Sequence, residues 1–199
     1  ILKNKENLCL QKKYLKLQLD PHFVFNSLSS LAGMIEDDPQ RAEEYVVRLS
    51  QVYRYMLFNI DQDYITISEA MDFTRTYVSL LNLKYNDKII LELDEEKVKE
   101  GDRILALSIQ LLIENAVKHN SPQENKPLHI QISVHKNMLT IKNNRIYFHG
   151  HNDQIVESYG IGLKNLKQRY ELECGKEIGY SVTHDFFEIR MPIIKKKKL

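Results

Sequence analysis

Apolar residues in this chain follow a helical repeat through most of the first 85 residues, after which a strand-like alternation appears. Between residues 42 and 56 they recur at steps of three and four, which places them on one face of a helix. From Ile89 to Leu93 the pattern is that of a strand. The chain is therefore expected to be α+β, with a mixed part beginning near Lys88. The helical stripe consists of Ala42, Tyr45, Val46, Leu49, Val52, Tyr53 and Met56.

Three helices are expected in the first part. A stripe over residues 8–31 predicts one long helix, bent at Pro21 because proline removes a backbone donor. Residues 37–39 predict a turn before the second helix, and a third helix is expected from Ser68 to near Lys84. Two amphipathic helices cannot enclose a core alone, whereas four helices from two chains can, so a homodimer is expected.

The second part is expected to form an antiparallel-rich sheet with helices over one face. Helices are predicted over residues 105–119 and 162–172 and hairpins over 128–141 and 180–191. The boundary is placed between a helical region, residues 1–85, and a second domain, residues 86–199.

Composition excludes several classes of function. The net charge of +1 provides no broad basic field, so nucleic acid is not an expected partner. No apolar run approaches the roughly 20 residues of a membrane-spanning helix. Cys9 and Cys174 lie far apart, which fits two ordinary thiols in a reducing compartment. The first residues do not resemble a signal peptide, and a fragment of a longer protein is expected. Lys195–Lys198 are expected to be a solvated or disordered tail, with contact to anionic lipid as the alternative.

The first chemical cluster surrounds His22 on the first helix. Gln18, His22 and Asn26 are four residues apart and therefore share one face. A neutral imidazole in this setting could act as a nucleophile. A histidine beside aromatic residues can equally be a partly buried structural residue.

Two further clusters lie in the second domain. Residues 114–120 end a helix with oxygen and nitrogen groups that could serve Mg²⁺ and phosphate, although a solvent-facing helix end is the alternative. In residues 160–165 glycines run directly into a helix, whose free backbone N–H groups favour phosphate. Two glycines are also consistent with a simple helix start.

Together these clusters resemble a known family. Residues 18–26 resemble the phosphoacceptor motif of the LytS-type sensor histidine kinases, Q-hydrophobic-N-P-H-F-hydrophobic-F-N. Residues 114–119 are similar to the N box of the GHKL ATPase domain, and residues 160–165 to its second glycine box, G-x-G-L-x-N. The order and spacing match from about Leu15 onward. The resemblance implies a dimerising helical hairpin followed by an α/β sandwich ATP-binding domain of GHKL type.

The resemblance implies a role for each matching residue. His22 would accept the γ-phosphoryl group of ATP, Glu114 would polarise or help deprotonate the attacking group, and Asn115 would bind Mg²⁺. Residues 145–159 would form a lid over the nucleotide. The other expected nucleotide-binding residues are Lys118 and His119 at phosphate-facing positions, Asn143 at the adenine, and Gly160, Gly162, Leu163 and Asn165 in the glycine box.

The chain departs from the family pattern at two places. Asn143, Asn144 and Arg145 stand where the family has an Asp followed by Asn and Gly. Asn143 can still accept a hydrogen bond from the adenine amine, but without the charge of a carboxylate, and Arg145 lacks the backbone freedom of glycine. Asp20 replaces the usual Asn before proline and could support an imidazolium at the phosphoacceptor.

The implied function is that of a two-component sensor histidine kinase. It would phosphorylate His22 with ATP and Mg²⁺ and pass the phosphoryl group to an Asp of a response regulator receiver domain. This cytoplasmic domain would follow an N-terminal membrane or sensory region in the cell membrane, with a hinge near residues 59–63 or after Tyr85. The alternatives are a degenerate kinase acting as a dimeric scaffold and an ATPase driving conformational change.

Overall fold

The computed structural model describes residues 21–59, 61–120, 122–123, 125–146 and 160–195. Backbone contacts divide the chain into two compact units, Ile1–Gln62 and Asp63–Leu199. The expected boundary after residue 85 differs from this division, because the third helix packs on strands of the second unit. Among the residues described, no helix is long and apolar enough to cross a membrane.

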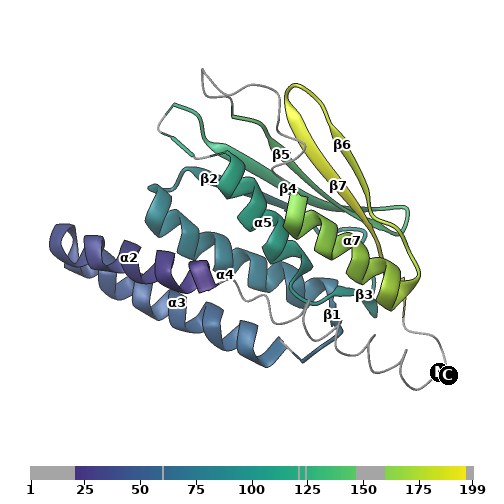
Figure 1. Ribbon diagram of the computed structural model, residues 1–199, viewed down its shortest axis with the longest axis horizontal. Coiled ribbons are helices and arrows are strands. Elements are labelled where there is room, and N and C mark those ends of the chain that lie inside the picture. The colour runs from purple at the N-terminus through teal and green to yellow at the C-terminus, as the bar shows by residue number, and fades with distance from the viewer. Residues whose placement is uncertain (1–20, 60, 121, 124, 147–159, 196–199) are drawn as a thin grey trace. The chain divides into compact units, whose positions relative to one another are not determined.

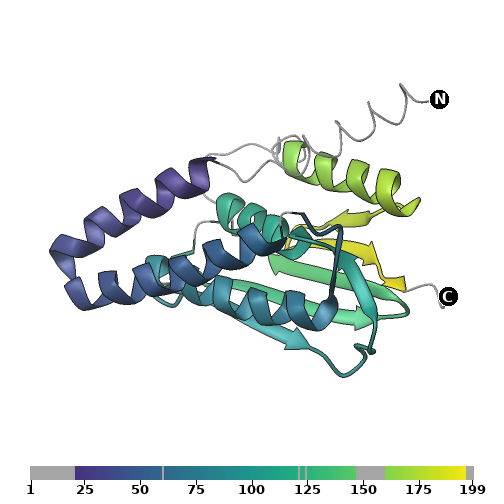
Figure 2. The same cartoon turned by 90° about the horizontal axis from the view of Figure 1, so that it is seen from below.

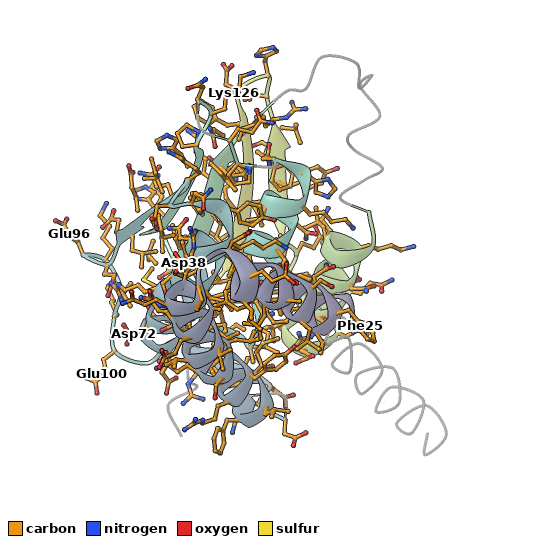
Figure 3. All side chains as sticks on the ribbon, turned by 90° about the vertical axis from the view of Figure 1, so that its left-hand side faces the viewer. Phe25, Asp38, Asp72, Glu96, Glu100 and Lys126 are labelled. Atoms are coloured by element: carbon orange, nitrogen blue, oxygen red, sulfur yellow. The ribbon has the colours of Figure 1, made fainter. Side chains whose placement is uncertain are left out.

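The first unit is a helical hairpin, drawn in purple and blue in Figure 1. Helix α2 spans Pro21–Asp37 and helix α3 spans Pro39–Asn59. Asp38, labelled at the turn in Figure 3, accepts the backbone N–H of Arg41 at 3.0 Å through its side chain. This N-cap bond and the proline at the first helical position begin α3, which confirms the expected turn. The part of the long first helix expected before residue 21 lies outside the described residues.

Most of the apolar stripe expected on α3 is buried. The buried residues are Ala42, Tyr45, Leu49, Val52 and Met56, whereas Val46 is 45% exposed. The rings of Phe23 and Tyr53 lie 5.8 Å apart, which fixes α2 against α3. The helical repeat therefore identified the buried face correctly except at its margin.

A five-stranded sheet forms the second unit, with the strand order β2-β4-β5-β7-β6. Strands β2 and β4 are parallel, and the other neighbours are antiparallel. Both expected hairpins and the antiparallel-rich character are confirmed. The strands are β2 (Ile89–Asp94), β4 (Leu128–His135), β5 (Met138–Asn144), β6 (Gly179–Val182) and β7 (Phe186–Pro192).

Three helices cover one face of this sheet (Figures 1 and 2). They are α4 (Ile67–Tyr85), α5 (Ser108–His119) and α7 (Gly160–Cys174). Alternate residues of the central strands point to the helices and are buried, including Ile130, Ile132 and Ile141. Each such side chain stabilises the fold by roughly 1.5–3 kcal/mol. The expected mixed fold, a helical hairpin followed by an α/β domain, is confirmed.

A second, three-stranded sheet was not predicted. Its order is β1-β3-β8, with β1 at Tyr64–Thr66, β3 at Asp102–Leu105 and β8 at Ile194–Lys195, all antiparallel. Strands of two to four residues are too short to show a period, which is why the sequence did not reveal them. The helix expected from residue 105 begins only at Ser108, because Leu105 belongs to β3.

Helix α4 begins with a capping box two residues before the expected Ser68. Thr66 Oγ1 accepts the Glu69 backbone N–H at 3.2 Å, and the Glu69 carboxylate accepts the Thr66 N–H at 2.9 Å and its hydroxyl at 2.7 Å. Hydrogen bonds from Thr66 lower the pKa of Glu69 from its ordinary value of 4.5. The bond from the Thr66 backbone has the larger effect, and the bond from its side chain the smaller. A carboxylate whose pKa is lower in the folded than in the unfolded state stabilises the fold at pH values above the unfolded-state pKa. This contribution is lost as the pH falls through the folded-state pKa.

Thr66→Ala is expected to lower the free energy of unfolding by about 1 kcal/mol at neutral pH, because the cap is lost. The deficit should shrink below pH 4.5, where the parent also loses the Glu69 contribution. Urea unfolding at about pH 7 and about pH 3 measures both values. Thr76→Ala, which removes only a long 3.4 Å bond within the same helix, is the control. A deficit that stays constant with pH would contradict this account of the cap.

Candidate functional site

The candidate site is built on helix α5. Its buried side chains, Ile109, Leu112, Ile113, Ala116 and Val117, fix one face of the helix in the core of the second unit. Glu114 and Asn115 are half-buried and Lys118 is exposed, so the polar residues lie at the border of that face. The helix therefore presents its polar motif from a rigid support rather than as a freely solvated helix end.

Glu114 is held by two hydrogen-bond donors. The Tyr77 hydroxyl of α4 donates to Glu114 Oε1 at 2.9 Å, and Gln110 Nε2 donates to the same oxygen at 2.7 Å. Two donors to one oxygen restrict the side-chain torsions of Glu114. Neither Tyr77 nor Gln110 was predicted as a site residue. The spacing of four residues between Gln110 and Glu114 was a usable signal, whereas nothing in the sequence pairs residue 77 with residue 114.

Asn115 lies against the first turn of α7. A Cβ added to Gly162 would lie 3.1 Å from Asn115 Nδ2 and 3.4 Å from the Leu111 side chain, so glycine permits the close approach of the two helices. Asn115 Nδ2 is buried, and no described residue accepts a hydrogen bond from it. Leaving a buried donor without a partner costs roughly 1–3 kcal/mol. Such an arrangement is stable only if something else compensates, and a bound ligand is one candidate.

The end of α5 carries two basic residues, Lys118 and His119. Burial lowers the pKa of His119, and the positive charge of Lys118 lowers it further. At neutral pH the His119 imidazole is therefore largely neutral. Asn120 caps the helix by donating to the Ala116 carbonyl at 2.8 Å and accepting the Ile146 N–H at 2.9 Å.

Asn143 is buried in the middle of the sheet, on the face covered by the helices. Its neighbours across the strands are Ile130 and Phe187, and its Nδ2 donates to the Asn144 carbonyl at 2.7 Å. This bond fixes the orientation of the amide, which leaves Oδ1 as the acceptor. Asn143 can therefore present a neutral oxygen where the family pattern has a carboxylate.

The residues after Asn143 are tied into the sheet. The Asn144 side chain accepts the His129 N–H at 2.8 Å and donates to the Pro127 carbonyl at 3.0 Å. The Arg145 N–H donates to the Asp185 carbonyl at 2.8 Å. These bonds hold the strand end in place without the glycine of the family pattern.

Helix α7 begins at Gly160. The backbone N–H groups of its first turn have no acceptor within the helix. Leu163 is buried and Asn165 is half-buried. The two motif segments, residues 160–165 and 114–119, thus lie against each other at Gly162 and Asn115. The expected lid falls outside the described residues over 147–159.

His22 lies in the first turn of α2, in the first unit. Its side chain and Gln18 lie outside what the structure describes, so the three-residue face expected around it stays a prediction. Asn26, the third member, is exposed on α2.

Comparison with known proteins adds an independent observation. Residues 10–89 match the model of the histidine kinase family, a range that includes His22 and helix α4. These residues are therefore similar to a histidine kinase domain. The matched range contains the helical hairpin, β1 and α4, whereas α5 and α7 follow it.

The sensor protein kinase HptS of Staphylococcus aureus resembles the chain in sequence. In strains USA300 and MRSA252 it is 25% identical over 181 residues, which cover 91% of this chain and 31% of HptS. The chain thus spans about a third of the length of these curated relatives.

Solved histidine kinases also resemble the structure. ThkA in complex with the response regulator protein TrrA matches with a TM-score of 0.46 and 16% identity, covering 89% of this chain and 60% of that one. Acinetobacter baumannii histidine kinase AdeS matches with a TM-score of 0.43 and 16% identity, covering 86% and 97%.

The residues of α5 and α7 fit Mg²⁺ and a nucleotide phosphate. The Asn115 amide offers an oxygen of the kind Mg²⁺ prefers and a buried, unpartnered N–H donor for a phosphate oxygen. The close approach at Gly162 brings the first turn of α7 beside that amide. Over the part of the chain that the structure describes, no cluster of three or more His, Cys, Asp or Glu could hold a metal by itself. In nucleotide sites Mg²⁺ is generally held by one or two protein oxygens together with phosphate oxygens.

Proposed function

We propose that this chain is the catalytic part of a two-component sensor histidine kinase, which uses Mg²⁺-ATP to phosphorylate His22. The histidine kinase family match over residues 10–89 contains His22. The observation that carries the nucleotide part is the buried Asn115 amide beside Gly162. No described residue accepts a hydrogen bond from Asn115 Nδ2, and a Cβ at Gly162 would lie 3.1 Å from that atom. The fold of the second unit places both on adjacent helices over one sheet.

Positioning accounts for most of the proposed mechanism. ATP supplies the phosphoryl group, and Mg²⁺ neutralises phosphate charge. Asn115 would contribute an oxygen ligand to the metal, while Lys118 and the first turn of α7 would face the phosphates. Asn143 Oδ1 would accept from the adenine amine. Glu114 would orient and polarise the His22 imidazole, whose neutral nitrogen forms the new P–N bond as the bond to ADP breaks.

The phosphoryl group would then move from His22 to an Asp of a response regulator receiver domain. In this step the P–N bond would break as a P–O bond to the Asp carboxylate forms, which returns His22 to a neutral imidazole. His22 lies at the beginning of α2, the first helix that the structure describes. We also propose that the full-length protein carries a sensory, membrane-associated region before this cytoplasmic part, since the HptS relatives are about three times as long.

A homodimer through α2 and α3 completes the proposal. Large apolar side chains remain exposed on both helices, and Phe25, labelled in Figure 3, is 66% exposed. A two-helix unit gains stability when a second copy covers such a surface and forms a four-helix bundle. The exposed residues are Val24, Phe25, Leu28, Ile35, Val46, Val47, Leu57 and Phe58.

The chemistry of the labelled protein tests the kinase proposal. After incubation with Mg²⁺ and γ-labelled ATP, the chain should carry label that is lost in acid and stable in alkali, as phosphohistidine is. Phosphate release without labelled protein would favour the ATPase alternative. Neither label nor nucleotide binding would favour the scaffold alternative.

A further inference from the structure

Tyr77 connects helix α4 to the catalytic motif of α5. Its side chain is 1% exposed, and its hydroxyl donates to Glu114 Oε1 at 2.9 Å across 37 residues of sequence. The ring of Phe73 stacks on Tyr77 with centroids 5.9 Å apart, which holds the phenol in one orientation. The hydroxyl is therefore a fixed donor rather than a mobile one.

Gln110 donates to the same carboxylate oxygen, although its own amide oxygen is buried without a donor among the described residues. Its Nε2 donates to Glu114 Oε1 at 2.7 Å, whereas its own Oε1 is buried and receives no hydrogen bond from any described residue. A buried amide oxygen without a donor is unfavourable. The Gln110 amide is thus oriented so that Nε2 binds Glu114 while its own oxygen remains without a hydrogen bond from a described residue. Such a compromise is typical of groups retained for function.

We propose that Tyr77 is a positioning residue that sets the direction of the Glu114 carboxylate for phosphoryl transfer. The inference rests on the proposed kinase function, in which Glu114 polarises the attacking imidazole. With Tyr77 and Gln110 both bound to one oxygen, the carboxylate plane is defined from two helices. A purely structural role would also give a buried tyrosine a partner, so the test must separate rate from stability and from binding.

Tyr77→Phe removes one hydroxyl and keeps the packed ring. At saturating Mg²⁺-ATP we expect the autophosphorylation rate of the full chain to fall about 10-fold, because the carboxylate loses its fixed direction. The dissociation constant for ATP should stay within about twofold of the parent, since Glu114 is not a phosphate ligand. Tyr64→Phe is the matched control, because it too loses one tyrosine hydrogen bond, 2.9 Å to the Glu173 carbonyl, and leaves Glu114 untouched.

A double-mutant cycle shows whether Tyr77 acts through Glu114. In a Glu114→Gln background, Tyr77→Phe should produce no further loss of rate, because the carboxylate it orients is gone. An equal loss in both backgrounds would overturn the positioning role. A parent that becomes labelled at the same rate as Tyr77→Phe would overturn this inference alone. A parent that never becomes labelled would overturn the kinase proposal and this inference with it.

Discussion

Asn115→Leu is expected to abolish Mg²⁺-dependent ATP binding while making the fold more stable. Leucine keeps a similar volume but removes the metal-ligand oxygen and the phosphate donor, so affinity should fall at least about 100-fold. The same change removes a buried donor that no described residue satisfies, which should raise the free energy of unfolding by about 1 kcal/mol. Titration calorimetry with Mg²⁺-ATP and urea unfolding measure the two effects.

The opposite signs of these two effects distinguish a ligand site from a structural defect. Asn59→Leu serves as the control, because that amide already donates to the Tyr55 carbonyl at 3.0 Å and lies in the other unit. It should lose stability and keep ATP affinity. Unchanged affinity in Asn115→Leu would show that the amide beside Gly162 is not part of a nucleotide site.

A fragment of residues 63–199 is expected to fold and bind Mg²⁺-ATP, whereas a fragment of residues 86–199 is expected not to fold. Helix α4 contributes several fully buried apolar side chains to the core of the second unit, among them Ile67, Met71 and Leu80. At roughly 1.5–3 kcal/mol for each large side chain, the loss of the helix is comparable to the 5–15 kcal/mol that holds a typical domain together. Circular dichroism and thermal unfolding of the two fragments measure the difference. A cooperative transition in residues 86–199 would restore the boundary expected from the sequence.

Hydrogen bonds explain why residues 63–85 belong with the sheet. Asn82 exchanges two bonds of 2.9 Å with the backbone of Ile89, which locks the end of α4 to the start of β2. At the other end, the Ala106 N–H donates to the Asp63 carbonyl at 3.1 Å, and β1 pairs with β3. Of the two hinge positions expected from the sequence, these contacts oppose the one after Tyr85. A hinge, if the mechanism uses one, would lie before Asp63.

Regular periodicity predicted the large elements but not what joins them. The stripe on α3 and the two hairpins were readable because each extends over several repeats of its period. The strands of the small sheet were not, since β1, β3 and β8 have only two to four residues each. Without that sheet, α4 was taken for a connector, although its capping box and its buried residues make it part of the second unit.

Motif matching likewise located α5 and α7 but not the geometry between them. The sequence identified Asn115 and Gly162 separately, and only the packing shows that Gly162 leaves space for the Asn115 amide. Tyr77 could not be predicted, because its partner lies 37 residues away on another helix. At Asn143, the sequence could not show the bond from Nδ2 to the Asn144 carbonyl, which orients the amide.

The most direct test of the kinase account compares three chains in one labelling experiment with Mg²⁺ and γ-labelled ATP: the parent, His22→Ala and His135→Ala. His135 is exposed on β4 and belongs to no proposed site, so its variant controls for the loss of any histidine. The account predicts acid-labile label on the parent and on His135→Ala and none on His22→Ala, which should still bind ATP. Label of equal intensity on His22→Ala would contradict it.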